Sequence, residues 1–168
     1  MNEHEIETAR ALVASPHFAW QPAMIDTLGR RVLETSMDPT STLWVRSDTH
    51  GWLTENLFNA PLLPEGGFTQ ALPCLSDDGT RGALEGLACR LWGDPGLYAL
   101  EWWCMSGGNL ARRPVWRIHT GRGRYQSATC GVGETKGEAW ARAVMGAKST
   151  EEKPATLSWF DFKETTGG

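Results

Sequence analysis

The chain has 168 residues, enough to bury one sizeable core, with a formal net charge of −4 and 9 Trp beside only 2 Tyr. This mild acidity argues against bulk electrostatic binding to nucleic acid and is too small to make a strong case for a DNA mimic. No apolar run is long enough to cross a bilayer and the acidic start predicts no signal peptide, so we expect a cytoplasmic protein without membrane contacts.

The first third of the chain predicts one helix followed by short strands. Residues 3–14 carry apolar side chains at helical spacing. The buried face of this helix would consist of Ile6, Ala9, Leu12 and Val13. Residues 24–35 are expected to form two short strands about Gly29. A turn over 36–41 and an alternating strand over 42–46 follow.

The segment from Asp48 to Gln70 is rich in Gly, Pro and Asn and predicts a long ordered loop. It is too apolar to be fully solvated, which leaves two alternatives. The loop either folds over the core or exposes an apolar patch, with Trp52 and Phe58 as anchors for a protein partner.

The stretch from Leu72 to Pro95 predicts a central helix around which the other elements are arranged. Asp77, Asp78 and Thr80 can accept hydrogen bonds from the first free N–H groups. The apolar stripe of this helix would consist of Leu84, Leu87, Ala88 and Leu91. Gly93 is a typical stop signal.

Three strands are expected after the central helix, over 98–105, 114–120 and 123–130. The first is apolar on both alternating faces, which is typical of a central strand covered on both sides. The other two would form a hairpin about a two-residue turn at 121–122, a register that places His119 opposite Arg124.

In that register one face of the hairpin is basic and consists of Arg113, Arg117, His119 and Arg124. Clustered guanidinium groups can hold a phosphate or a carboxylate, so the face is a candidate anion or ligand site. The alternative is a solvated outer face, balanced by acidic side chains on a neighbouring strand.

The last helix is expected over 135–147, where Thr135 and Glu138 have the spacing of a capping box. The tail over 149–168 is charged and then aromatic, and Trp159 is its candidate partner-binding residue. This tail either docks as an extra strand on its own domain, which we favour, or adds to the sheet of a partner.

No catalytic or metal-binding signature is present in the sequence. The four cysteines lie far apart and are expected to be reduced thiols: Cys74, Cys89, Cys104 and Cys130. The glycines at 131 and 133 fit neither phosphate-loop fingerprint, and no nucleophile elbow occurs. We therefore expect no enzyme activity, no cofactor and no bound metal.

Three pieces of the sequence carry a family resemblance. They are Phe18 to Met24 followed by Arg31-Val-Leu, then Leu72-Pro-Cys-Leu75 with Asp78 to Gly82 and Trp92 to Pro95, and then Gly133 to Ala139. In this order they resemble small uncharacterised proteins encoded by bacteriophages and prophages, over roughly residues 16–147. The chain departs from the resemblance at Ala23, where glycine is expected. The resemblance implies an accessory role inside the bacterial cell and no particular activity.

Together these patterns predict a single α+β domain over residues 1–148, with an antiparallel sheet of about five strands packed with about three helices. The functional hypothesis is a non-enzymatic phage accessory protein that binds and modulates a host bacterial protein, for example as an anti-CRISPR-like inhibitor of a defence system. Two alternatives stay open: a small-ligand or nucleotide-binding protein that uses the basic face, and a virion structural or assembly protein. Nucleic acid is not an expected partner, and a homodimer is left open.

Overall fold

The computed structural model describes residues 1–59, 71–104, 113–121 and 128–147, apart from the side chains of 102–104 and 113–114. The elements in chain order are α1 (Glu3–Val13), β1 (Val32–Met37), β2 (Leu43–Ser47), β3 (Trp52–Thr54), α2 (Glu55–Asn59), α3 (Asp78–Trp92), β4 (Tyr98–Cys104), β5 (Arg113–His119), β6 (Thr129–Gly133) and α4 (Lys136–Met145). The predicted tail over 149–168, including Trp159, lies outside the described residues.

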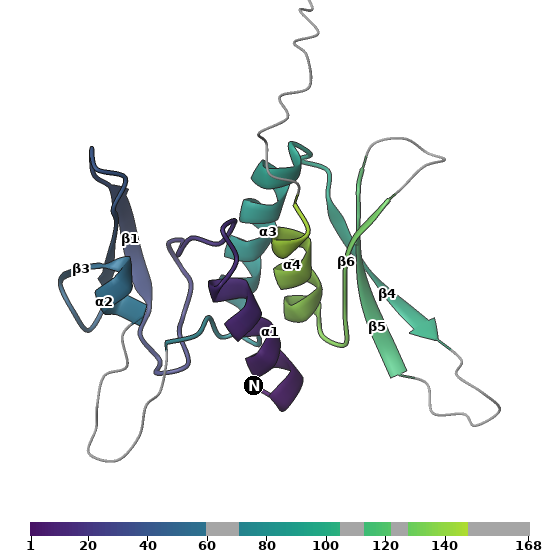
Figure 1. Cartoon of the computed structure of the whole chain (residues 1–168). Coiled ribbons are helices and arrows are strands. Elements are labelled where there is room, and N and C mark those ends of the chain that lie inside the picture. The colour runs from purple at the N-terminus through teal and green to yellow at the C-terminus, as the bar shows by residue number, and fades with distance from the viewer. Residues whose placement is uncertain (60–70, 105–112, 122–127, 148–168) are drawn as a thin grey trace, which may run out of the picture.

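The α+β class is confirmed, but the strands form two antiparallel sheets of three strands each, in the orders β1-β2-β3 and β4-β5-β6. The long helices α1, α3 and α4 lie between these sheets (Figure 1). The expectation of one sheet of about five strands is therefore wrong. Each strand pairs with its neighbour in sequence, and α3 separates the two groups along the chain.

The first sheet shows why the loop predicted over 48–70 was only partly right. Strand β3 pairs with β2, and α2 follows it directly. Phe58 on α2 is fully buried. Its ring meets the ring of Trp20 edge-on, with centroids 4.9 Å apart. The alternative in which this segment folds over the core therefore holds for Phe58, whereas Trp52 and Leu57 stay exposed.

The strand boundaries before β2 also differ from the prediction. Of the two strands predicted about Gly29, the second is present as β1 from Val32, whereas before Gly29 there are only isolated bridges of Ile25 with Arg31 and of Asp26 with Pro73. Strand β1 continues to Met37, into the range predicted as a turn. Ala23 has a φ of 76°, a backbone conformation that favours glycine. This is the position where the family resemblance leads us to expect glycine.

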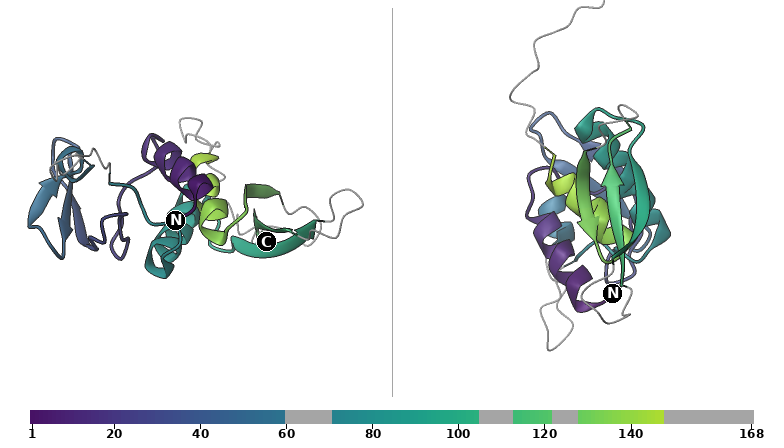
Figure 2. Two further views of the ribbon diagram at one scale, coloured as in Figure 1. Left: turned by 90° about the horizontal axis from the view of Figure 1, so that it is seen from below. Right: turned by 90° about the vertical axis from the view of Figure 1, so that its right-hand side faces the viewer.

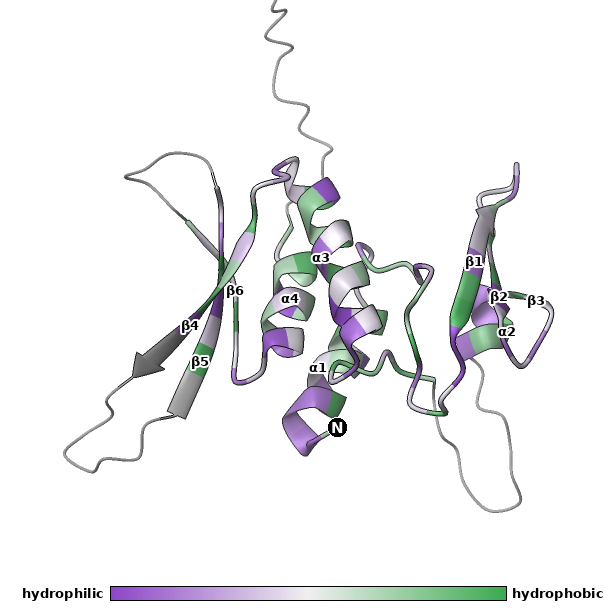
Figure 3. Ribbon diagram, turned by 180° about the vertical axis from the view of Figure 1, so that it is seen from behind, coloured by the Kyte–Doolittle hydropathy of each residue, from purple (hydrophilic) through white to green (hydrophobic). Residues whose placement is uncertain are grey.

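The first and last predicted helices are confirmed, and both begin with a capping box. In α1 the helix starts after a capping box that Asn2 forms with Glu5, and its first turn is hydrophilic (Figure 3). In α4 the capping box of Thr135 and Glu138 is present. Such reciprocal bonds satisfy N–H groups that a helix start leaves open.

The central helix α3 is confirmed as well. Asp77 caps it by accepting from the N–H of Thr80, at 2.7 Å, and Gly93 ends it with a φ of 59°. Leu84 and Ala88 are fully buried. The hydroxyl of Thr80 also accepts from the backbone N–H of Ile25, which ties α3 to the segment that leads into the first sheet.

The second sheet has a different hairpin register from the predicted one. Thr120 donates its N–H to the carbonyl of Ala128, and His119 pairs with Thr129 rather than with Arg124. The reason is that Gly121 is occupied elsewhere: its N–H donates to the Asp94 carboxylate at 2.9 Å, and its backbone packs on Gly96. The predicted turn at 121–122 is therefore wrong.

Helix α4 packs on the second sheet at very short range. A side chain at Gly131 or Gly133 of β6 would collide with the backbone of Ala139. The two glycines let helix and strand approach this closely. On the strand between β4 and β6, Ile118 faces the same side and is fully buried.

One cluster of buried apolar residues connects all of these layers. It runs from Val32 and Val45 of the first sheet through Trp20 and Leu72 to the helices and Ile118. A buried ion pair, in which Arg30 donates from Nε to Asp26 at 2.6 Å, lies in the connection between the first sheet and the helices.

Candidate functional site

The face of the second sheet that points away from α4, called here the outer face, is uncovered by any described helix or strand (Figures 1 and 2). One cross-strand row consists of Leu100, Arg117 and Val132, and the next begins with Tyr98 and His119. Tyr98 is 40% exposed, Leu100 43% and Val132 38%. The prediction that β4 is covered on both sides is wrong, because among the described strands β4 lies at the edge of its sheet and its Tyr98 and Leu100 side chains are exposed.

Of the four residues predicted as an anion site, the structure brings two together. Arg117 and His119 lie on the outer face, two residues apart on β5. The His119 ring stacks on Tyr98, with centroids 5.6 Å apart, and its two nitrogens are buried without hydrogen-bond partners among the described residues. The side chain of Arg113 and the whole of Arg124 lie outside the described part of the chain. The corrected register removes the predicted pairing of Arg124 with His119.

The three residues predicted to anchor a partner differ in their exposure to solvent. Trp52 is 42% exposed on β3 and is available to a partner. Phe58 is fully buried and is held under the guanidinium of Arg30, whose carbon lies 4.3 Å from the ring centroid. It therefore cannot anchor a partner in this fold, because its ring already fills the core. Trp159 lies outside the described residues.

Trp52 belongs to a mixed surface on the first sheet. Arg46 is its cross-strand partner, with the guanidinium carbon 5.8 Å from the Trp52 ring. Arg46 also donates to Glu34 on β1, with the closest contact at 3.0 Å. Cation–π and ion-pair contacts at exposed sites are each worth about 0.5–1 kcal/mol or less. Trp52 is therefore held in place but still open to solvent.

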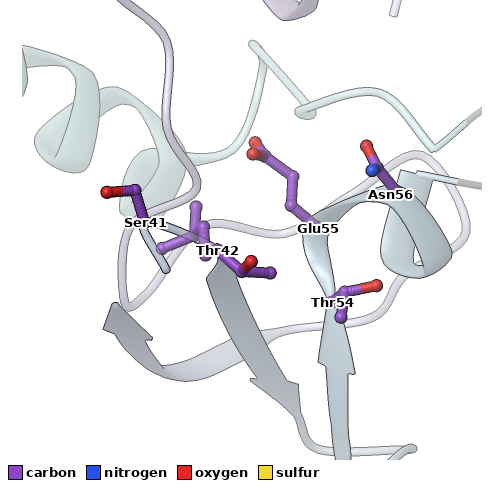
Figure 4. A pocket seen from close by; sticks show the side chains of 6 residues that line it. Ser41, Thr42, Thr54, Glu55 and Asn56 are labelled. Carbon is purple, nitrogen blue, oxygen red and sulfur yellow. The ribbon is translucent and has the colours of Figure 1, made fainter. Parts of the chain in front are cut away.

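A polar hollow, defined by Ser41, Thr42, Leu43, Thr54, Glu55 and Asn56, lies between the start of β2 and the start of α2 (Figure 4). Its volume is about 210 Å³. Burial raises the pKa of the Glu55 carboxyl above its ordinary value. Sequence reasoning missed this site, because the wall formed by β3 and α2 lies in a segment predicted to be a loop.

The hairpin beside the hollow is organised by Asp38. Its carboxylate accepts from the Thr40 hydroxyl at 2.7 Å, from the Thr42 N–H at 2.9 Å and from the Trp44 indole at 3.1 Å. These donors favour the ionised form and lower the pKa of Asp38 to about 2. The Asp38 carboxylate therefore stays charged at neutral pH and holds the turn there.

The replacement Asp38→Asn is expected to make the chain less stable at pH 7, because an amide nitrogen would face the Trp44 donor. Since the folded pKa of Asp38, about 2, lies below its ordinary value of 3.8, its stabilising contribution is present above 3.8 and is lost as the pH falls toward 2. The stability gap between the two proteins, measured by urea unfolding across this range, should shrink with falling pH. A gap that stays constant would contradict this role.

The described cysteines show no sign of catalytic activation. Cys74, Cys89 and Cys130 are free thiols. Burial raises the pKa of the Cys89 and Cys130 thiols, which lowers the thiolate fraction at neutral pH.

Within the described ranges, no group of His, Cys, Asp or Glu is arranged to hold a metal ion. No described helix is long and apolar enough to cross a membrane.

These features define an α+β protein with an open apolar sheet face at one end and an exposed tryptophan surface and a polar hollow at the other (Figure 1). Comparisons with protein families, with curated proteins and with solved structures find no match to this chain.

Proposed function

We propose that this protein acts by binding another protein through the outer face of the β4–β6 sheet. The observation that supports the proposal is the presence of three exposed apolar side chains on one face that no described helix or strand covers: Tyr98 and Leu100 on β4, and Val132 on β6. Single exposed apolar residues are ordinary on protein surfaces, whereas several that gather on one face mark an interaction site.

The chemistry of the face selects the kind of partner. Arg117 lies in the row between Leu100 and Val132, so a positive charge is set among apolar neighbours. Arg and Tyr are both enriched in the centres of protein interfaces. The partner in this proposal is a protein that presents an apolar segment to this face.

The cellular setting comes from the sequence. Because residues 16–147 resemble small phage-encoded proteins, the proposed partner is a protein of the host bacterial cell, for example a component of a defence system. The protein would act by occupying a surface of that partner, without catalysis.

The test uses the replacement Leu100→Asp, with Leu57→Asp as the matched control. Leu57 is 58% exposed on α2, at the other end of the molecule. A partner captured from bacterial lysate is purified, and its affinity is measured for the wild type and both variants. We expect Leu100→Asp to weaken binding at least about 30-fold, as for an interface hot spot, and Leu57→Asp to leave it unchanged.

Three outcomes would overturn the proposal. Equal affinities of all three proteins would remove the outer face from the interface. Loss of binding on Trp52→Ala with Leu100→Asp unaffected would move the interface to the first sheet. Self-association of the wild type in sedimentation that Leu100→Asp abolishes, with no other protein bound, would assign the face to a second copy.

A further inference from the structure

The polar hollow is a second site, separate from the outer face. Figure 4 shows Glu55 and Asn56 extending from the start of α2, and Ser41 and Thr42 at the start of β2 across from them. At about 210 Å³ the hollow has room for several waters at about 30 Å³ each, but it is smaller than the 300–1,000 Å³ of typical drug-sized sites. It can therefore take a small head group and not a nucleotide.

The hydrogen bonds around Asp38 decide what Thr42 can offer to a guest. Thr40 has one hydroxyl hydrogen and donates it to Asp38, at 2.7 Å. The 3.0 Å contact between the hydroxyls of Thr40 and Thr42 must then have Thr42 as its donor. The oxygen of Thr42 keeps only its lone pairs for the hollow, so it acts there as an acceptor.

Glu55 adds a second acceptor and the only charge among the described lining residues. It makes no ion pair or hydrogen bond through its side chain with the described part of the chain, and none of the six lining residues is cationic. Burial disfavours its charged form, as the raised pKa shows, and a cation in the hollow would offset that cost. An anionic guest would instead be repelled.

From this arrangement we infer that the hollow binds a primary ammonium group. An ammonium has three N–H donors. They match the Glu55 carboxylate, the Thr42 oxygen, and either the Ser41 hydroxyl or the Asn56 amide oxygen. Leu43 in the lining provides apolar contact for the carbon attached to the nitrogen. The ammonium can belong to a free amine or to a lysine side chain of a protein.

The probes are butylammonium and Nα-acetyl-lysine-N-methylamide, with butyrate as the control of opposite charge. Binding is followed by amide chemical shifts of residues 41–56 in two-dimensional NMR. We expect saturable shifts with both amines, with a Kd on the order of 1 mM for a guest of this size, and none with butyrate. Tighter binding of butylammonium points to a free amine as the source, and tighter binding of the lysine derivative points to a protein.

Two variants test whether the ammonium binds in the hollow. Glu55→Gln keeps the shape of the side chain and removes the charge, and Thr42→Val removes the acceptor oxygen. Each should weaken amine binding at least tenfold, while Glu7→Gln, the same change at an exposed position of α1, should not. Three results would each overturn the inference. The first is that neither amine gives a saturable shift at concentrations far above 1 mM. The second is that butyrate gives equal shifts, and the third is that Glu55→Gln binds the amines with full affinity. None of these results bears on the outer face of the β4–β6 sheet.

Discussion

Replacement of Arg30 by methionine is expected to lower the free energy of unfolding by about 3–5 kcal/mol, the cost of leaving one partner of a buried ion pair alone. The Arg30 side chain is 4% exposed, and that of Asp26 is fully buried. Arg30 also donates to the carbonyl of Phe58 at 2.9 Å, which ties the turn at 26–30 to α2. Methionine fills similar space but leaves the Asp26 carboxylate without its counter-ion.

The control for this prediction is Arg46→Met. Arg46 forms an ion pair with Glu34 at 3.0 Å, but both side chains are at least two-fifths exposed. Exposed pairs contribute at most about 1 kcal/mol. The double variant Asp26→Asn with Arg30→Met should be more stable than Arg30→Met alone, because no buried charge is left unpaired. Urea unfolding measures all four proteins, and equal losses for Arg30→Met and Arg46→Met would contradict the prediction.

Replacement of Gly131 by alanine is expected to destabilise the protein by at least about 3 kcal/mol, at the upper end of overpacking effects. A Cβ at this position would lie 2.7 Å from the backbone nitrogen of Ala143 and closer still to the carbonyl oxygen of Ala139. Both atoms belong to the backbone of α4, so no side-chain rotation relieves the collision. The strand and the helix would have to separate.

The same substitution at Gly82 should have the opposite effect. Gly82 lies within α3, is exposed, and has open space where a Cβ would stand, with no neighbouring atom within 4 Å. Alanine is favoured over glycine in helices by up to about 1 kcal/mol, so Gly82→Ala should raise the midpoint of thermal unfolding. Insoluble Gly131→Ala beside soluble Gly82→Ala would agree with the prediction. A Gly131→Ala protein as stable as the wild type would show that β6 and α4 are not packed this closely.

The long helices α1, α3 and α4 were predictable because their signals are local. Asp77 and Thr135 cap the helices that follow them through bonds to residues three positions along. The apolar stripe of α3 repeats within the helix itself. The strand pairings were less predictable. The hairpin turn at 121–122 satisfied the usual preferences, but Gly121 instead contacts Gly96 and Asp94, more than twenty residues earlier.

The candidate sites depended still more on distant contacts. Trp52 and Phe58 are both large, aromatic and set in the same irregular segment, yet one is open to solvent and the other is enclosed by Trp20 and Arg30. The polar hollow was not predicted at all, because no spacing rule connects Thr42 with Glu55. The outer face was predicted as basic, whereas its described exposed side chains are mainly apolar.

By itself the sequence determined the α+β class, the ends of α1, α3 and α4, and the alternation that places Trp116 and Ile118 on one side of β5 and Arg117 and His119 on the other. Only the tertiary structure decided that the strands divide into two sheets, which sheet face stays open, and which aromatic residues are buried. The physical reason is the distance along the chain over which each signal acts. Caps and apolar periodicity are set by residues within one or two helical turns, whereas exposure depends on what the rest of the folded chain places over each residue.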